Sequence, residues 1–119
     1  MEAQVGQFID QVANSLVRLE VLLFFVQNPS TTESPEGIAW RIYREVEQIR
    51  EAMEHLSQHG VLETLDLPGG NYRLFALTEN PSTLNLVRRL ADYYYNDAER
   101  RIEIVRRLVT QPRREASSP

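Results

Sequence analysis

The stretch REVEQIREAMEHLSQHGVLE, residues 44–63, constrains the fold of this chain more than any other part of the sequence. Its apolar side chains recur at three- or four-residue steps: Val46, Ile49, Met53 and Leu56. This spacing predicts an amphipathic helix from about Glu45 to His59. Gly60 stands just past that helix, where a glycine commonly ends one. A strand-like run follows at once, so the helix is expected to end directly beside a sheet.

The sheet is predicted by two runs rich in β-forming residues, VLETLDL at 61–67 and YRLFAL at 72–77. They are joined by PGGN, residues 68–71. Glycine and asparagine tolerate the positive φ angles that tight hairpin turns require. We therefore expect an antiparallel β-hairpin directly after the helix.

A shorter helix is predicted before residue 44. The segment NPSTTESPEG, residues 28–37, has the prolines, glycine and small polar residues of a loop. Within it, Ser34 can cap a helix, Pro35 suits the first helical position, and Glu36 favours the positive helix end. The helix is expected from Pro35 to about Tyr43, with inward-facing apolar residues at Ile38, Ala39 and Ile42.

Longer helices are predicted at both ends of the chain. Apolar periodicity indicates one helix over residues 4–27, and NPST at 80–83 starts a last helix that continues to about Leu108. The chain length of 119 residues suits one domain. We assign this domain to residues 1–111, with a C-terminal helix at about 82–108, and expect a disordered tail over 112–119.

Several classes of protein are disfavoured by the sequence. It has no cysteine, which excludes disulfides, thiolate metal sites and cysteine nucleophiles. Its longest apolar run, Val21 to Val26, is too short to span a membrane, and its first residues lack the pattern of a signal peptide. It has no glycine-rich phosphate loop and no nucleophile motif. We therefore expect a cytoplasmic protein that is not an enzyme, needs no cofactor and does not contact a membrane.

The order and apolar pattern of these elements resemble the winged helix-turn-helix transcription regulators, the group that includes ArsR-type and MarR-type repressors. The segment RLEVLLFFVQNP also looks like the first helix of that group. The positions that match its pattern, in register and without a gap, are Ile38, Ala39, Ile42, Ile49, Met53, Leu56, Gly60, Val61 and Leu62. The resemblance covers residues 16–77. It implies a mainly α fold with a small β-hairpin wing (α+β), with long N- and C-terminal helices.

The same resemblance implies a prokaryotic, sequence-specific regulator that binds double-stranded DNA as a homodimer. The helix at 45–59 would enter the major groove, with Arg44, Gln48 and Arg50 as base and backbone contacts. Arg41 would contact a phosphate. Asn71 and Arg73 would reach the DNA from the wing.

The sequence departs from the family pattern where DNA contacts would lie. Tyr43 stands at the position of the family's turn glycine. The hydroxyl residues that open the family's reading helix are replaced by Glu45-Val46-Glu47-Gln48. Residues 44–63 contain five glutamates and two arginines, and carboxylates repel phosphates. The alternative is a winged-helix protein–protein interaction module that does not bind DNA. The charges that cover this helix and the hairpin discriminate between the two functions.

The last predicted helix suggests a dimer interface. One stripe of it carries Leu86, Leu90, Tyr94, Ile104 and Leu108. A helix of this length would extend about 40 Å at 1.5 Å per residue, which is too long for this core to cover. An exposed apolar stripe implies a partner, most simply a second copy. Tyr93, Tyr94 and Tyr95 either pack in that interface or line a pocket for a small-molecule effector.

His55 and His59 are four residues apart, with Glu51 one turn earlier, and this is a spacing found in metal sites. This spacing alone is common. The simpler interpretation is two exposed histidines near a helix C-terminus, where positive charge is favourable. We therefore expect no metal.

Overall fold

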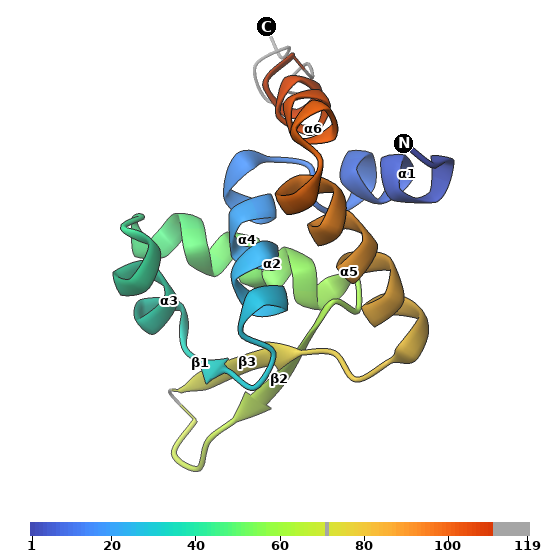
Figure 1. The fold of residues 1–119 in the computed structure, drawn as a ribbon. Helices are drawn as coiled ribbons and strands as arrows, with labels where there is room; N and C mark the ends of the chain where they lie inside the picture. Colours follow the sequence, from blue (N-terminus) through green and yellow to red (C-terminus); the bar gives the residue numbers. More distant parts are fainter. Residues whose placement is uncertain (71, 111–119) are drawn as a thin grey trace, which may run out of the picture.

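The computed structural model describes residues 1–70 and 72–110 of this protein. A small sheet lies at one end of the molecule with the helices on one side of it, and the β2–β3 hairpin extends from that end (Figure 1). The predicted tail at 112–119 lies outside the described residues. The elements in chain order are α1 (Ala3–Gln11), α2 (Leu16–Gln27), β1 (Thr32–Glu33), α3 (Pro35–Ile42), α4 (Val46–Gln58), β2 (Leu62–Asp66), β3 (Arg73–Leu77), α5 (Pro81–Asn96) and α6 (Ala98–Thr110).

The single N-terminal helix predicted over residues 4–27 is wrong, because the chain forms two helices there. Helix α1 ends at Gln11 and α2 begins at Leu16. The Ser15 hydroxyl accepts a hydrogen bond from the backbone N–H of Arg18 at 3.1 Å and so caps α2. A serine cap satisfies a backbone donor that has no partner at a helix start, which favours a new helix over a continuous one. Helix α1 is thereby free to turn away from α2 toward α5 (Figure 1).

The long C-terminal helix is divided in the same way. Helix α5 ends at Asn96, and Asp97 has an extended backbone with φ −141° and ψ 100°. The Asp97 carboxylate accepts from the backbone N–H of Arg100 at 3.1 Å and caps α6. The expectation of one helix of about 40 Å is therefore wrong. Helix α6 instead starts anew at Ala98 and packs against α5 and α2, and its Arg107 bonds to Asp10 of α1.

The predicted hairpin is confirmed, and the sheet has one strand more than predicted. Strands β2 and β3 pair antiparallel, with Leu62 opposite Leu77 and Asp66 opposite Arg73. The two-residue strand β1, within the predicted loop, pairs with the other edge of β3. Strand β1 leads directly into α3, so the sheet fixes where α3 begins.

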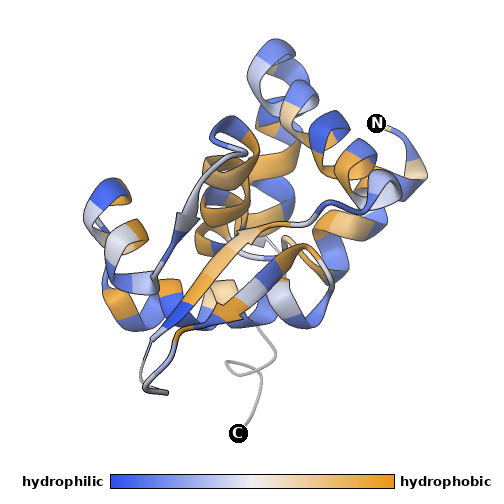
Figure 2. Ribbon diagram, turned by 90° about the horizontal axis from the view of Figure 1, so that it is seen from below, coloured by the Kyte–Doolittle hydropathy of each residue, from blue (hydrophilic) through white to orange (hydrophobic). Residues whose placement is uncertain are grey.

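The core lies between α2, α4, α5 and the sheet. Hydrophobic positions gather toward the middle of the molecule, and hydrophilic positions dominate its periphery (Figure 2). The largest fully buried side chains include Leu22 and Phe25 of α2, Ile49 and Met53 of α4, and Phe75 of β3. Among the described residues, no helix is both long and apolar enough to cross a membrane.

Candidate nucleic-acid interface

The helix pair α3–α4 is set up by local signals at its start and at its turn. The Ser34 hydroxyl accepts from the backbone N–H of Gly37 at 3.1 Å, and Pro35 occupies the first turn of α3. Helix α3 ends with Tyr43 in the left-handed conformation, φ 57° and ψ 50°. A side chain there costs roughly 1–2 kcal/mol. The turn nevertheless keeps the shape that a glycine gives, and α4 packs against α3.

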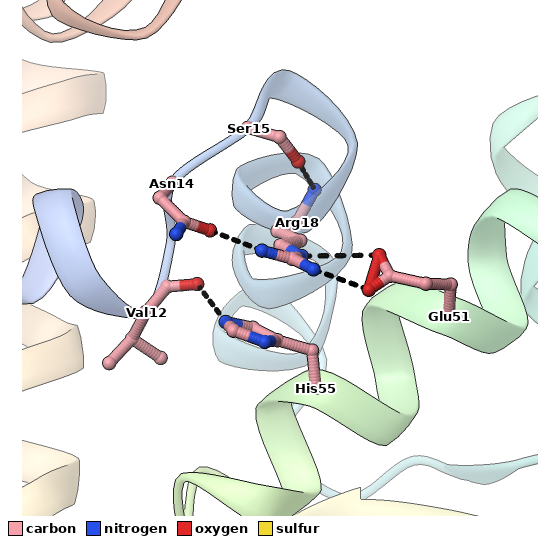
Figure 3. A network of polar contacts seen from close by, with 6 residues as sticks. All are labelled: Val12, Asn14, Ser15, Arg18, Glu51 and His55. Carbon is pink, nitrogen blue, oxygen red and sulfur yellow. Dashed lines mark hydrogen bonds and ion pairs between the residues drawn. The ribbon is translucent and has the colours of Figure 1, made fainter. Parts of the chain in front are cut away.

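Helix α4 is held in place by side chains that join it to the α1–α2 junction (Figure 3). Arg18 of α2 donates to both carboxylate oxygens of Glu51 and, at 2.6 Å, to the Asn14 side-chain oxygen. One turn further along α4, His55 Nε2 donates to the Val12 carbonyl oxygen at 2.9 Å. The segment between α1 and α2 is therefore bound to two successive turns of α4. Val12 bonds to His55, and Asn14 is linked to Glu51 through Arg18.

These contacts position Glu51 and correct the sequence-based assignment of His55. The Glu51 carboxylate, 57% exposed, bonds to Arg18 of α2. His55, expected to be exposed, is half-buried, and this burial, together with nearby Arg18 and His59, lowers its pKa. Its Nε2 is already engaged with a backbone carbonyl. In the part of the chain that the structure describes, no group of three or more His, Asp or Glu residues could hold a metal ion.

Two of the predicted DNA-contacting arginines converge on one hollow. Arg50 of α4 and Arg73 of β3 both line a hollow of about 370 Å³ between α3, α4 and the hairpin. Three carboxylates line it too: Glu36, Glu54 and Asp66. Gln48 is exposed on α4, and Asn71 lies outside the described residues.

Both arginines in the hollow are paired with carboxylates. Arg50 donates to Glu36 at 3.0 Å and lies 3.5 Å from Glu47. The hydrogen bond from Arg50 lowers the pKa of Glu36. Arg73 donates to the two oxygens of Asp66 at 2.8 and 3.3 Å, and its hydrogen bond lowers the pKa of Asp66. The hollow is therefore an array of opposite charges at neutral pH.

The other two predicted arginines point elsewhere. Arg44 donates twice to Glu20 of α2, at 3.2 and 2.9 Å. Arg41 lies 3.5 Å from Glu33 and 6.0 Å from the centre of the Phe24 ring. All four arginines thus have a carboxylate partner, and residues 32–78 contain eight carboxylates and four arginines.

This arrangement of helices and hairpin is similar to solved regulators. A possible transcriptional regulator from Methanosarcina mazei Go1 is 12% identical, with a TM-score of 0.58 over 82% of this chain and 84% of that one. A MepR variant from a multidrug-resistant S. aureus isolate is 15% identical, with a TM-score of 0.58 over 96% and 76%. A double mutant of Lactococcus lactis ZitR in apo form is 13% identical, with a TM-score of 0.54 over 94% of this chain and 77% of that one.

The chain has a winged helix-turn-helix fold. In this fold α3 and α4 are the helix-turn-helix, and the β2–β3 hairpin is the wing. The predicted fold class, mainly α with a β-hairpin wing, is confirmed. No protein-family model and no curated protein sequence matches the chain. At this identity the likeness concerns the winged-helix fold, and activity must be argued from the surface.

The winged-helix core uses much of the stripe predicted to form a dimer. Leu90, Ile104 and Leu108 are buried within this chain, and Leu86 and Tyr94 pack partly buried against the same core. These five residues therefore have a role in the fold that needs no second copy. The exposed apolar residues of α6 lie on a different side of the helix.

That second stripe was missed by the sequence analysis. Ile102 is 53% and Val109 is 59% exposed, and half-exposed Val105 lies between them at helical spacing. Their signal was present in RIEIVRRLV, but it overlaps the stripe of Ile104 and Leu108. Because the positions of the two faces alternate along this segment, periodicity alone does not show which face packs against the core.

The tyrosines of α5, expected either in an interface or in an effector pocket, make contacts within this chain. Tyr93 donates to Glu2 at 3.1 Å, and the rings of Tyr94 and Tyr95 contact edge to face at 5.2 Å between centres. The hollow of about 440 Å³ along α5 is lined by other residues, including Leu84 and Arg88.

Proposed function

We propose that this protein is a sequence-specific DNA-binding transcriptional regulator that acts as a homodimer. The observation that carries the proposal is the convergence of Arg50 and Arg73, from the second helix of the helix-turn-helix and from the wing, on one hollow. In this fold, that helix enters the major groove and the wing meets the adjacent backbone. Arg50 and exposed Gln48 would read base edges, and Arg73 would contact a phosphate.

The carboxylates that pair with these arginines weaken the interaction without preventing it. An exposed ion pair contributes only about 0–1 kcal/mol, so a phosphate can replace a glutamate as the partner of an arginine. The released carboxylate then lies near the DNA and repels it. We therefore expect weaker binding than the arginines alone would provide, with a strong dependence on salt.

A second copy would pack on α6. One side of this helix packs on the core, and the stripe of Ile102, Val105 and Val109 stays exposed or half-exposed on another side. In a twofold dimer, the stripe on α6 of one copy would pack against the same stripe on α6 of the other copy. Two copies of α4 would then face successive major grooves of an inverted repeat.

The decisive experiment is selection of bound duplexes from a random pool at low salt, followed by anisotropy of the selected DNA against rising salt. The expected result is an inverted repeat, bound with a log–log salt slope of about −5 for some three phosphate contacts per subunit. Arg50→Ala is expected to lose this binding. Arg88→Ala, on the exposed side of α5, is the matched control and should retain it. A pool that shows no enrichment and no binding at low salt contradicts the proposal.

A second candidate function is a protein-interaction module that does not bind DNA. The observation that favours it is the pairing of Arg41, Arg44, Arg50 and Arg73 with carboxylates, on a segment where acids outnumber arginines two to one. Such a surface attracts a cationic partner and repels phosphates. Failure of the selection, together with binding of a basic protein, would establish this function instead.

A further inference from the structure

Two large aromatic side chains stand in solvent at the helix-turn-helix. Trp40 is 81% exposed and Tyr43 is 91% exposed. Glu36 and Trp40 are four residues apart, so their side chains lie along one side of α3, and Tyr43 directly follows the last residue of that helix. We name Glu36, Trp40 and Tyr43 the α3 stripe. Because Glu36 bonds to Arg50 of α4, this stripe adjoins the surface proposed to meet DNA.

The turn between α3 and α4 requires a left-handed residue at position 43, but the fold does not explain why that residue is tyrosine. Its backbone is left-handed, with φ 57°, which costs a residue with a side chain roughly 1–2 kcal/mol and costs glycine almost nothing. Its ring recovers little of this cost by burial, because it is almost fully exposed. A strained residue that contributes little to packing indicates a role for its side chain outside the fold.

The charges around the stripe are carboxylates together with arginines that are already paired: Arg41 with Glu33, Arg44 with Glu20 and Arg50 with Glu36. Exposed Glu45 and Glu47 follow Tyr43 at the start of α4. Glu36 stays ionised because its hydrogen bond from Arg50 lowers its pKa. Carboxylates beside exposed aromatic faces disfavour phosphate and favour guanidinium or ammonium groups, which also bind aromatic faces by cation–π contact.

We propose that the α3 stripe is the docking surface for an arginine- or lysine-rich segment of a partner protein. Cationic side chains of that segment stack on Trp40 and Tyr43 and pair with Glu45 and Glu47. The proposal does not depend on DNA binding by α4. If both hold, the partner and the DNA compete, because the stripe and Arg50 share Glu36.

Trp40 is the only tryptophan of the chain, so its fluorescence reports directly on this surface. The probe is a twelve-residue peptide of alternating arginine and glycine, titrated at low salt into the full-length protein. A peptide of alternating glutamate and glycine and a short DNA duplex are titrated in parallel. The expected result is a saturable change in Trp40 emission with the arginine peptide alone.

The variants test whether the aromatic rings and the acids act together. Tyr43→Asn removes the ring while keeping a residue that tolerates the left-handed conformation, and it is expected to weaken peptide binding at least fivefold without lowering the melting temperature. Glu45→Gln combined with Glu47→Gln is expected to weaken it at least tenfold. Tyr72→Asn removes an exposed tyrosine from the wing and is the matched control, with no change expected.

Arg50→Ala separates this inference from the proposed function. Removing Arg50 frees Glu36 and Glu47, so peptide binding should strengthen while any DNA binding weakens. The proposal is overturned if no saturable response to the arginine peptide occurs, or if Tyr43→Asn binds it as wild type does. A response to the duplex without one to the arginine peptide overturns it as well and assigns the stripe to nucleic acid. Loss of DNA binding alone leaves these peptide results unchanged.

Discussion

Arg18 of α2 and Glu51 of α4 are joined by two hydrogen bonds across 33 residues of chain. Arg18 also holds Asn14, so the junction of α1 and α2 and the helix that would meet DNA form one unit. A displacement of α1, whether by a second copy or by a ligand, would therefore reach α4 directly.

This ion pair should make a measurable contribution to stability. Arg18 is only 22% exposed while Glu51 is 57% exposed, so we expect Arg18→Ala to lower the free energy of unfolding by about 1 kcal/mol. A double-mutant cycle with Glu51→Ala, measured by urea denaturation, should give a coupling of about 0.5–1 kcal/mol. The cycle for Arg100 and Glu103, neighbours on α6, serves as a comparison and should give less. Additive effects of Arg18→Ala and Glu51→Ala would contradict this assignment.

His55 should make stability depend on pH. Burial, then Arg18 and His59, lower its pKa in the folded state below the ordinary value of 6.5. The unfolded chain therefore binds a proton first, and the contribution of neutral His55 is complete above pH 6.5 and is lost as the pH falls toward its folded pKa. His55→Gln should flatten the difference in unfolding free energy between pH 7 and pH 5, measured by urea denaturation. If His55→Gln leaves that difference unchanged, groups other than His55 cause the loss of stability at low pH.

The carboxylates in the hollow should restrain DNA binding if the proposed function holds. Asp66→Asn removes the two-oxygen partner of Arg73 and frees it for phosphate. The expected result is a severalfold higher affinity for the selected duplex, because Arg73 no longer has to exchange a carboxylate for a phosphate. Asp92→Asn changes the net charge equally from α5 and should have a smaller effect. Equal gains from both variants would indicate net charge rather than release of Arg73.

The two apolar stripes of α6 should respond differently to substitution. Ile104→Ala opens space in the core, where Ile104 is fully buried, and should lower the free energy of unfolding by about 2–4 kcal/mol. Ile102→Ser changes an exposed position and should leave the folded monomer intact while abolishing self-association, as measured by sedimentation at several concentrations. A dimer that survives Ile102→Ser combined with Val109→Ser would place the interface elsewhere.

The parts of the fold that were predicted correctly depend on neighbouring residues. Ser34 and Pro35 start α3, Gly60 with its positive φ follows α4, and the glycines of PGGN form the hairpin turn. Each acts through backbone geometry within a few positions, so it can be recognised without knowing the rest of the chain. The two missed helix breaks were also signalled locally, by Ser15 and Asp97. There, apolar periodicity continued through the break and concealed the caps.

Contacts between distant parts of the chain decided the remainder. Glu20 draws Arg44 toward α2 from 24 residues away, and Arg18 does the same to Glu51. The spacing of residues in the sequence does not predict these two ion pairs, because a charged residue can pair with any opposite charge that folding brings near. Likewise, α6 has two apolar faces, and only its packing against α5 and α2 buries Ile104 and leaves Ile102 in solvent. Local backbone chemistry therefore specified the helices and the hairpin. The candidate binding surface depends instead on which side chains the packed elements bring together.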